Sequence, residues 1–179
     1  VVEMAAAFFE KCLRMPEGRA ALDYLRGRGL TEETIKRFRL GFSPDGRGKL
    51  KSMLAAEGIE ESAMVAAGLL VQPEDRNRDP YDRFRGRVMF PITDRQGRVI
   101  AFGARLLAGD GPKYLNSPET SLFHKGRNLY GLAQAKEAVR EHGNIVVCEG
   151  YTDVIALAQA ACFSPTDAAM IDAAMRGHE

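Results

Sequence analysis

Two β-like runs joined by a tight turn constrain the fold of this chain more than any other feature. The first run covers residues 83–92 and the second covers 98–105, with a turn at 94–97 between them. Alternation of apolar residues is typical of a strand, and a glycine within the turn supplies the positive φ that such turns require. The apolar residues on one face of the first run are Val88, Phe90 and Ile92. The sequence therefore predicts a central antiparallel hairpin, in which Gly103 leaves room for another backbone or a phosphate.

The charge of the chain is concentrated around this hairpin. The 179 residues are 45% hydrophobic, which is enough for one core, and carry a net charge of only +1. Residues 76–127, however, contain eleven Lys and Arg against five Asp and Glu, so this segment carries +6 and the remainder −5. Such a local excess predicts an anionic partner, although a solvated arginine face would give the same composition.

Basic residues interleaved with a tyrosine follow the hairpin. This pattern suits a single-stranded nucleic acid, because the cations track the phosphates while an aromatic ring stacks on any base. Asn116 and Ser117 have an alternative role, since they lie between two prolines and can brace the loop instead. The candidates for phosphate contact are Arg105, Lys113, Lys125 and Arg127, with Tyr114 as the stacking residue.

The last third of the chain predicts one strand–helix unit preceded by a helix at 132–142. Residues 145–148 form a short apolar run typical of a strand buried on both faces, and Glu149 follows at its carboxyl end. A carboxylate there can hold Mg²⁺, act as a general base, or simply pair with an arginine. Asp153 lies in the first turn of the next helix, where the dipole alone favours an acid.

The first 75 residues predict a scaffold of short helices at 1–14, 20–26, 50–56 and 62–67, with Thr31 capping one more and a strand at 38–42. The charged, proline-containing loop 72–80 is the predicted lobe boundary or flap. The three cysteines have no C-x-x-C spacing, so neither a zinc ribbon nor a disulfide framework is predicted. No segment resembles a signal peptide or membrane span, and a cytoplasmic location is expected.

Several strings closely resemble the catalytic core of bacterial DnaG-type DNA primases. They are Asp-Arg-Phe-Arg at 82–85, Arg-Val-Met-Phe-Pro-Ile at 87–92, Pro-Lys-Tyr-Leu-Asn-Ser-Pro-Glu-Thr at 112–120, Phe-His-Lys-Gly at 123–126 and Glu-Gly-Tyr-Thr-Asp-Val at 149–154. The last string resembles the opening of the Toprim motif. The resemblance implies an α+β fold, with a mixed N-terminal subdomain at 1–131 followed by the first strand–helix unit of a Toprim-like α/β domain at 132–179.

The resemblance implies a DNA-directed RNA polymerase that makes short RNA primers on single-stranded DNA during replication. Its expected partners are the template, the RNA primer, ribonucleoside triphosphates and a replicative helicase, the last bound through regions not in this chain, in a nucleoid-associated setting. The complete enzyme is expected to use Mg²⁺ or Mn²⁺, with Glu149 as a metal ligand and Glu149 and Asp153 as catalytic acids; no metal is expected to bind this chain tightly. The residues that match the basic surface with which the family guides template and incoming nucleotide, or that lie beside it, are Arg83, Arg85, Arg105, Lys113, Tyr114, Asn116, Lys125 and Arg127.

The chain departs from the family after Gln159. It contains no Asp-x-Asp pair, and the tail does not resemble the next strand of the family, which is consistent with truncation or an out-of-frame end. We therefore expect a piece of a longer protein that makes no primers alone. Because the sheet lacks neighbouring strands, we expect residues 145–148 to have an unpaired edge and apolar faces that are partly uncovered, and residues 144–179 to be the least stable part, able to associate with another copy. The alternatives are a non-catalytic single-strand-binding remnant and a phage or plasmid relative of the Toprim group, including a nuclease-like one.

Overall fold

The computed structural model describes residues 1–75, 77–161 and 169–172. The helices are α1 (Val2–Arg14), α2 (Arg19–Gly27), α3 (Glu32–Arg37), α4 (Lys49–Ala56), α5 (Glu61–Ala66), α6 (Leu132–His142) and α7 (Tyr151–Ala161), with 3₁₀ turns η1 (Pro16–Gly18) and η2 (Lys125–Arg127). The strands are β1 (Gly41–Ser43), β2 (Leu70–Val71), β3 (Tyr81–Asp82), β4 (Arg87–Thr93), β5 (Val99–Leu106), β6 (Tyr114–Asn116), β7 (Ile145–Cys148) and β8 (Ala169–Asp172). Within those ranges, no helix combines the length and the apolar character that crossing a bilayer demands.

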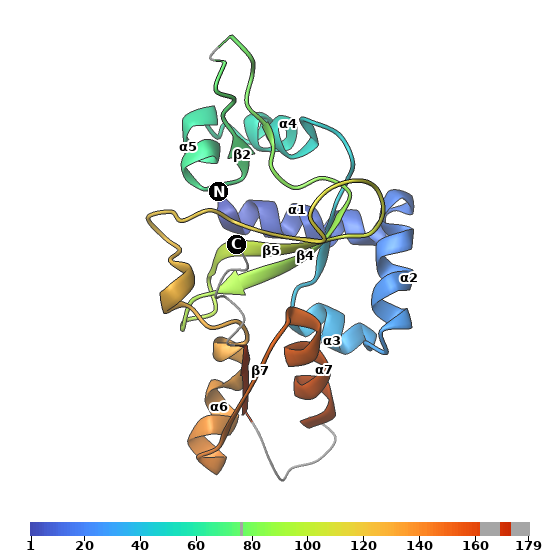
Figure 1. Ribbon diagram of the computed structural model, residues 1–179, viewed down its shortest axis with the longest axis vertical. Helices are drawn as coiled ribbons and strands as arrows, with labels where there is room; N and C mark the ends of the chain where they lie inside the picture. The colour runs from blue at the N-terminus through green and yellow to red at the C-terminus, as the bar shows by residue number, and fades with distance from the viewer. Residues whose placement is uncertain (76, 162–168, 173–179) are drawn as a thin grey trace.

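An antiparallel sheet in the order β1-β4-β5-β6 forms the centre of the molecule (Figure 1). The predicted hairpin is confirmed as β4 and β5, in a register that places Phe90 opposite Gly103. The first strand begins at Arg87 and not at residue 83. Gly86 has a φ of +60° and turns the chain just before β4. Tyr81 and Asp82, which precede this turn, form the separate strand β3 and pair with β2.

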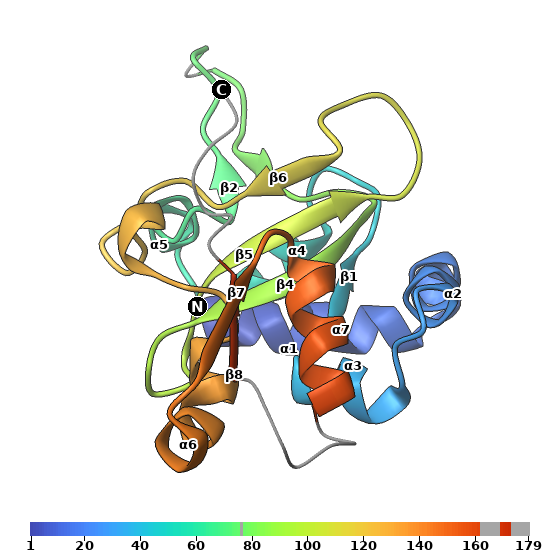
Figure 2. The ribbon, with the colours of Figure 1, turned by 60° about the horizontal axis from the view of Figure 1, so that its bottom comes forward.

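Both faces of the hairpin are buried, and each contacts a different helix. On one face, Phe102 meets Phe9 of α1 edge to face, with ring centres 5.3 Å apart. On the other face, Val88, Phe90 and Ile92 share a core with Tyr151 of α7, as the alternation predicts. Figure 2 shows α1 behind the sheet and α7 in front of it.

Two expectations for the first half of the chain are corrected. The strand expected at 38–42 starts only at Gly41, because Phe38 still ends α3 and Arg39 takes a left-handed φ of 54°. The loop 72–80 joins the paired strands β2 and β3 and projects at the top of Figure 1. The loop therefore connects the strands of a small hairpin and does not divide two lobes, while the alternative of a flap stays a prediction.

The C-terminal unit is α6, β7 and α7, with β8 paired in parallel to β7 so that Cys148 lies opposite Asp172. An apolar run of this kind is typical of a strand buried on both faces, but the partly uncovered faces expected for this chain are confirmed: Ile145 is 49% exposed, Val146 40% and Val147 56%. In the described residues its sheet has two strands, too few to cover both faces. The expectations for the tail at 162–168 and 173–179 lie outside the described residues.

Candidate nucleic-acid interface

The short strand β6 places the stacking candidate beside a cation. Tyr114 pairs with Arg105 of β5, and two residues on, Asn116 pairs with Gly103, so all four lie on one face of the sheet. Tyr114 is 46% exposed, and Lys113 beside it is exposed as well. This face of the sheet is also the one against which α7 packs.

A third element, α2, joins this group. The Arg105 guanidinium lies over the Tyr24 ring, 4.2 Å from its centre, and the Arg105 Nε is buried without a hydrogen-bond partner in the described part of the chain. Burial raises the pKa of the Tyr24 hydroxyl, while the charges of Arg105 and Arg28 act against that rise. Tyr24 and Arg28 were not predicted as site residues. In the sequence, Tyr24 and Arg28 show only a four-residue spacing that places them on one face of a helix. That spacing does not indicate that this face lies against Arg105 of β5.

The three arginines at 83, 85 and 87 have different surroundings. Arg83 is half-buried, its Nε has no hydrogen-bond partner in the described ranges, and burial lowers its pKa. Arg85 lies over the Tyr81 ring, 5.3 Å from its centre. Arg87 is buried and donates a hydrogen bond from Nη1 to the carbonyl of Pro112 at 2.9 Å. Arg87 thus braces the loop before Lys113.

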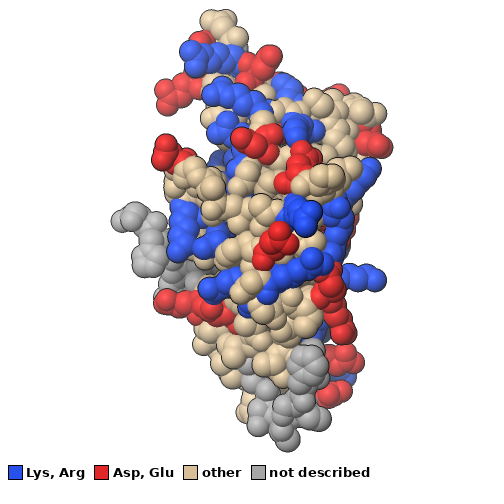
Figure 3. Space-filling model, turned by 90° about the vertical axis from the view of Figure 1, so that its right-hand side faces the viewer, with Lys and Arg blue, Asp and Glu red and all other residues tan. Residues whose placement is uncertain are grey.

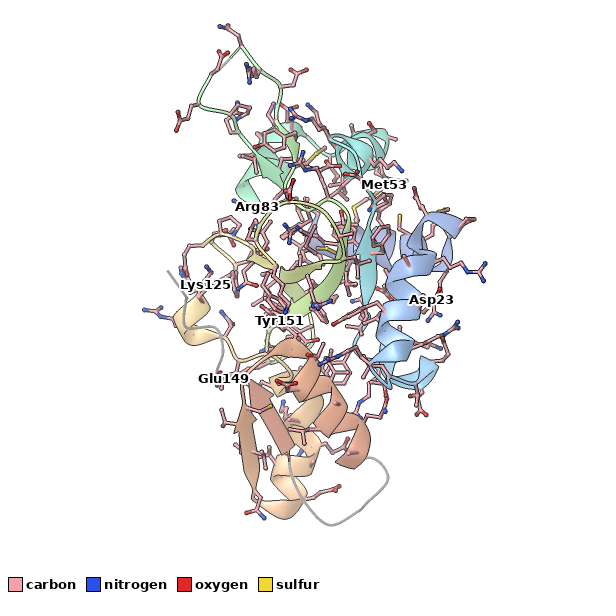
Figure 4. All side chains as sticks on the ribbon, turned by 45° about the vertical axis from the view of Figure 1, so that its right-hand side comes forward. Asp23, Met53, Arg83, Lys125, Glu149 and Tyr151 are labelled. Atoms are coloured by element: carbon pink, nitrogen blue, oxygen red, sulfur yellow. The ribbon has the colours of Figure 1, made fainter. Side chains whose placement is uncertain are left out.

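The turn η2 carries Lys125 and Arg127. Glu119 holds this turn by accepting a hydrogen bond from the Lys125 backbone N–H at 2.9 Å, and its other oxygen lies 2.8 Å from His124 Nδ1. These hydrogen bonds, the backbone one first, lower the pKa of Glu119. Among the described residues, neither Lys125 nor Arg127 forms an ion pair with a carboxylate. Figure 4 shows Arg83, Lys125 and Glu149 along the same side of the molecule.

The acidic turn between β7 and α7 contains the two candidate acids. Glu149 and Asp153 are both exposed. Gly150 has a φ of +94°, and a Cβ on it would lie 2.9 Å from the Asp153 carboxylate, so this turn requires glycine. The described residues contain no group of three or more His, Cys, Asp or Glu side chains that could hold a metal ion.

Tyr151 joins the acidic turn to the sheet. Its ring stacks on Phe90, with centres 5.1 Å apart and planes 9° from parallel, and a Cβ on Gly103 would lie 2.3 Å from the ring. Its hydroxyl donates to Asn116 Oδ1 at 2.8 Å. An aromatic ring therefore occupies the space expected at Gly103 for a backbone or phosphate, and Asn116 contacts the acidic unit. Ser117 is buried and accepts a hydrogen bond from the Phe102 N–H, in agreement with a bracing role.

Charged side chains are unevenly distributed over the surface. Figure 3 shows lysine and arginine side chains over the upper and middle parts of one side, interrupted by acidic residues. We use "the basic ridge" for the exposed or partly exposed group Arg105, Lys113, Tyr114, Lys125 and Arg127. An aromatic ring among cations at a sheet edge, beside a turn that carries acids, is an arrangement typical of nucleic-acid-binding surfaces, here on an α+β fold.

Comparisons with known proteins show which family the chain belongs to. The chain matches the family model for the DNA primase catalytic core, N-terminal domain, over residues 8–136, and it belongs to that family. It is 52% identical over 160 residues to the DNA primase of Pseudomonas aeruginosa PAO1, covering 89% of this chain and 24% of the relative. The chain thus spans about a quarter of the length of the curated relatives it matches.

Solved structures extend the similarity to the fold. A DNA primase domain from Pseudomonas aeruginosa has a TM-score of 0.85 and 48% identity, covering 96% of this chain and 52% of that one. A DnaG primase catalytic domain described as bound to single-stranded DNA has a TM-score of 0.82 and 42% identity, covering 96% and 51%. The α+β class expected from the sequence is confirmed.

Proposed function

We propose that this chain is the template-binding part of a bacterial DNA primase core and binds single-stranded DNA through the basic ridge. The observation that carries the proposal is the exposed Tyr114 between Lys113 and Arg105, on the sheet face against which the acidic turn is docked. The similar DnaG catalytic domain described as bound to single-stranded DNA supports the same role. Arg83 and Arg85 belong to the proposed template path as well.

Primer synthesis is proposed for the longer protein. In it, Glu149 would act as a catalytic acid and metal ligand, with Asp153 as its neighbour, and ribonucleoside triphosphates and an RNA primer as partners. Two exposed carboxylates do not make a site for Mg²⁺ or Mn²⁺, which prefer an octahedral set of about six oxygen ligands. The chain has no Asp-x-Asp pair to supply more. We therefore propose that this chain binds template but makes no primers.

The ridge is tested by the salt dependence of binding to oligo-dT. If about four to six phosphates are neutralised, the plot of log K against log salt concentration should have a slope of about −3 to −4. Lys113→Gln and Lys125→Gln should each make the slope shallower by about 0.7. Tyr114→Ala should weaken binding by about 1–3 kcal/mol without changing the slope, because stacking releases no counterions.

Lys36→Gln is the matched control, since Lys36 is exposed on α3 and its substitution removes the same charge. It should leave the slope unchanged. A binding constant that does not depend on salt, or equal effects of Lys36→Gln and Lys113→Gln, would contradict the proposed ridge.

A primer-synthesis assay separates a primase from a non-catalytic remnant. We expect no ribonucleotide incorporation by this chain, and incorporation by a version that continues through a complete Toprim domain. In that longer version Glu149→Gln should abolish activity, while Glu137→Gln on α6 should not. Activity of the present chain that Glu149→Gln abolishes would show that no further acids are needed. An inactive longer version would favour the remnant.

A further inference from the structure

An acidic side chain, Glu119, lies beside the cations of the basic ridge. It is exposed, and the hydrogen bonds from the Lys125 N–H and from His124 lower its pKa, so the carboxylate is ionised at neutral pH. A negative charge next to a site for a polyanion repels that polyanion. By charge alone, Glu119 therefore weakens binding of a nucleic acid at this end of the ridge.

The turn η2, which carries Lys125 and Arg127, depends on hydrogen bonds from outside itself. It is a single 3₁₀ turn of three residues, and such turns have poorer hydrogen-bond geometry than an α-helix. The first N–H groups of a helical turn have no partner within it, and the N-cap residue His124 supplies none from its side chain. Glu119 supplies that partner, since one of its oxygens accepts from the Lys125 N–H at 2.9 Å and the other lies 2.8 Å from His124 Nδ1.

The residues before Glu119 are attached to the central sheet. The Ser117 backbone N–H donates to the Phe102 carbonyl at 2.8 Å, and the Ser117 hydroxyl accepts from the Phe102 N–H at 3.0 Å. Pro118 packs against Gly68, where an added Cβ would lie 2.7 Å from the proline ring. Glu119 therefore extends from a backbone that β5 and Gly68 hold in place.

The residues after Glu119 bring the turn back to it. Thr120 and Phe123 exchange backbone hydrogen bonds at 3.0 and 3.3 Å, and Phe123 is fully buried. This closed loop leaves His124 and Lys125 facing the Glu119 carboxylate. The Lys125 ammonium group forms no ion pair with a carboxylate in the part of the chain that the structure describes, so the hydrogen bonds of Glu119 fix the backbone of Lys125 and leave its charge available.

We propose that Glu119 is a positioning residue of the basic ridge: its carboxylate fixes the backbone from which Lys125 reaches a phosphate, and this effect outweighs the repulsion between Glu119 and the bound strand. The inference rests on the proposed single-strand binding and concerns how one cation of that site is held. A side chain that starts from a fixed backbone loses less conformational freedom on binding than one on a loose turn.

Two substitutions of Glu119 remove the same charge but differ in hydrogen bonding. Glu119→Gln keeps an oxygen that accepts from the Lys125 N–H, whereas Glu119→Ala keeps none. Binding to oligo-dT is measured by fluorescence anisotropy over a series of salt concentrations. Glu119→Ala should weaken binding and make the salt slope shallower by about 0.7, as Lys125→Gln does, although it removes no cation. Glu119→Gln should keep the slope and bind at least as tightly as the wild type, and Glu33→Ala, at an exposed acid on α3, is the charge control and should keep the slope as well.

A second background shows whether Glu119 acts through Lys125. With Lys125→Gln already present, Glu119→Ala should change the slope no further, because the cation that it positions is absent. A general loss of structure would instead weaken binding in both backgrounds. Thermal unfolding of Glu119→Ala should match that of the wild type, since the side chain is exposed.

The outcomes separate this inference from the proposed function. If Lys125→Gln makes the slope shallower but Glu119→Ala and Glu119→Gln both tighten binding, repulsion alone describes Glu119 and the inference is wrong while the ridge stands. If Glu119→Ala has the same effect with and without Lys125, Glu119 does not act through Lys125 and the inference is wrong. If the wild type does not bind oligo-dT, the proposed function fails and the inference fails with it.

Discussion

At the scale of single residues, the contact between Tyr151 and Gly103 determines where the acidic turn lies. Tyr151 contacts Phe90 from one direction and Tyr130 from another, with its ring 4.8 Å from Tyr130 and at 86° to it. Gly103 is required because any side chain there would enter the ring. Asn116 accepts a hydrogen bond from the Tyr151 hydroxyl. The Tyr151 side chain therefore joins the strand that carries Tyr114 to the turn that carries Glu149.

We expect Gly103→Ala to lower the free energy of unfolding by about 1–3 kcal/mol, because the added methyl group overlaps the Tyr151 ring. Gly27→Ala is the control, since Gly27 ends α2 without a positive φ and an added methyl group there would have no atom within 4 Å. Urea unfolding measures both.

The clash is assigned by repeating Gly103→Ala in a Tyr151→Leu background. In that background Gly103→Ala should lower the free energy of unfolding much less, because the aromatic ring that the methyl group would overlap is absent. Equal costs in both backgrounds would mean that Gly103 is required for another reason.

At the scale of elements, α4 begins without a capping side chain of its own. Its N-cap residue is Gly48, and the buried Asp82 of β3 accepts hydrogen bonds from the first-turn N–H groups instead. Burial raises the pKa of the Asp82 carboxyl, although these hydrogen bonds act against the rise. Because the folded-state pKa lies above the unfolded one, the folded protein binds more protons between the two values.

The stability linked to this proton is therefore complete below the unfolded pKa of about 3.9 and is lost as pH rises through the folded pKa. Asp82→Asn does not titrate. We expect the free energy of unfolding of the wild type, minus that of Asp82→Asn, to be larger at about pH 3.5 than at about pH 7. Urea unfolding at both pH values measures it, and a difference that grows with pH would place the folded pKa below the unfolded one.

At the scale of the whole molecule, α7 is held at both ends while β7 is covered poorly. Tyr151 anchors the first end, and at the other end Gln159 accepts from the Thr31 N–H at 2.8 Å and donates to the Gly29 carbonyl at 2.9 Å. In contrast, Ile145, Val146 and Val147 are largely exposed. The docked helix should therefore be more stable than the strand that precedes it.

Hydrogen exchange measures this difference. We expect amides of β7 to exchange faster than those of α7, and both to exchange faster than amides of β4, which is buried along its length. Gln159→Ala should speed exchange in α7 and leave β4 unchanged, with Gln96→Ala in the exposed hairpin turn as the control. Equal protection of β7 and β4 would contradict the prediction that this region is the least stable.

Much of the architecture could be predicted because it depends on neighbours in sequence. The alternation at Val88, Phe90 and Ile92 and the glycine at 97 specify the hairpin, and Gly97 indeed has a φ of +83°. The charge excess at 76–127 predicts the proposed binding segment, and the motifs shared with primases identify the family. Helix boundaries also followed from local patterns and from capping residues such as Thr31.

The remaining features depend on contacts between distant segments, which no local pattern encodes. Only the tertiary structure brings Tyr24 of α2 beneath Arg105, fills the space at Gly103 with the ring of Tyr151, and gathers Arg47 and Arg85 on Tyr81. It also exposes β7, whose sequence alone is typical of a buried strand, because burial depends on how many strands the sheet supplies. The sequence determined where charged residues lie along the chain and which apolar residues share one face of a strand. Packing of distant segments decided which of these residues are in contact.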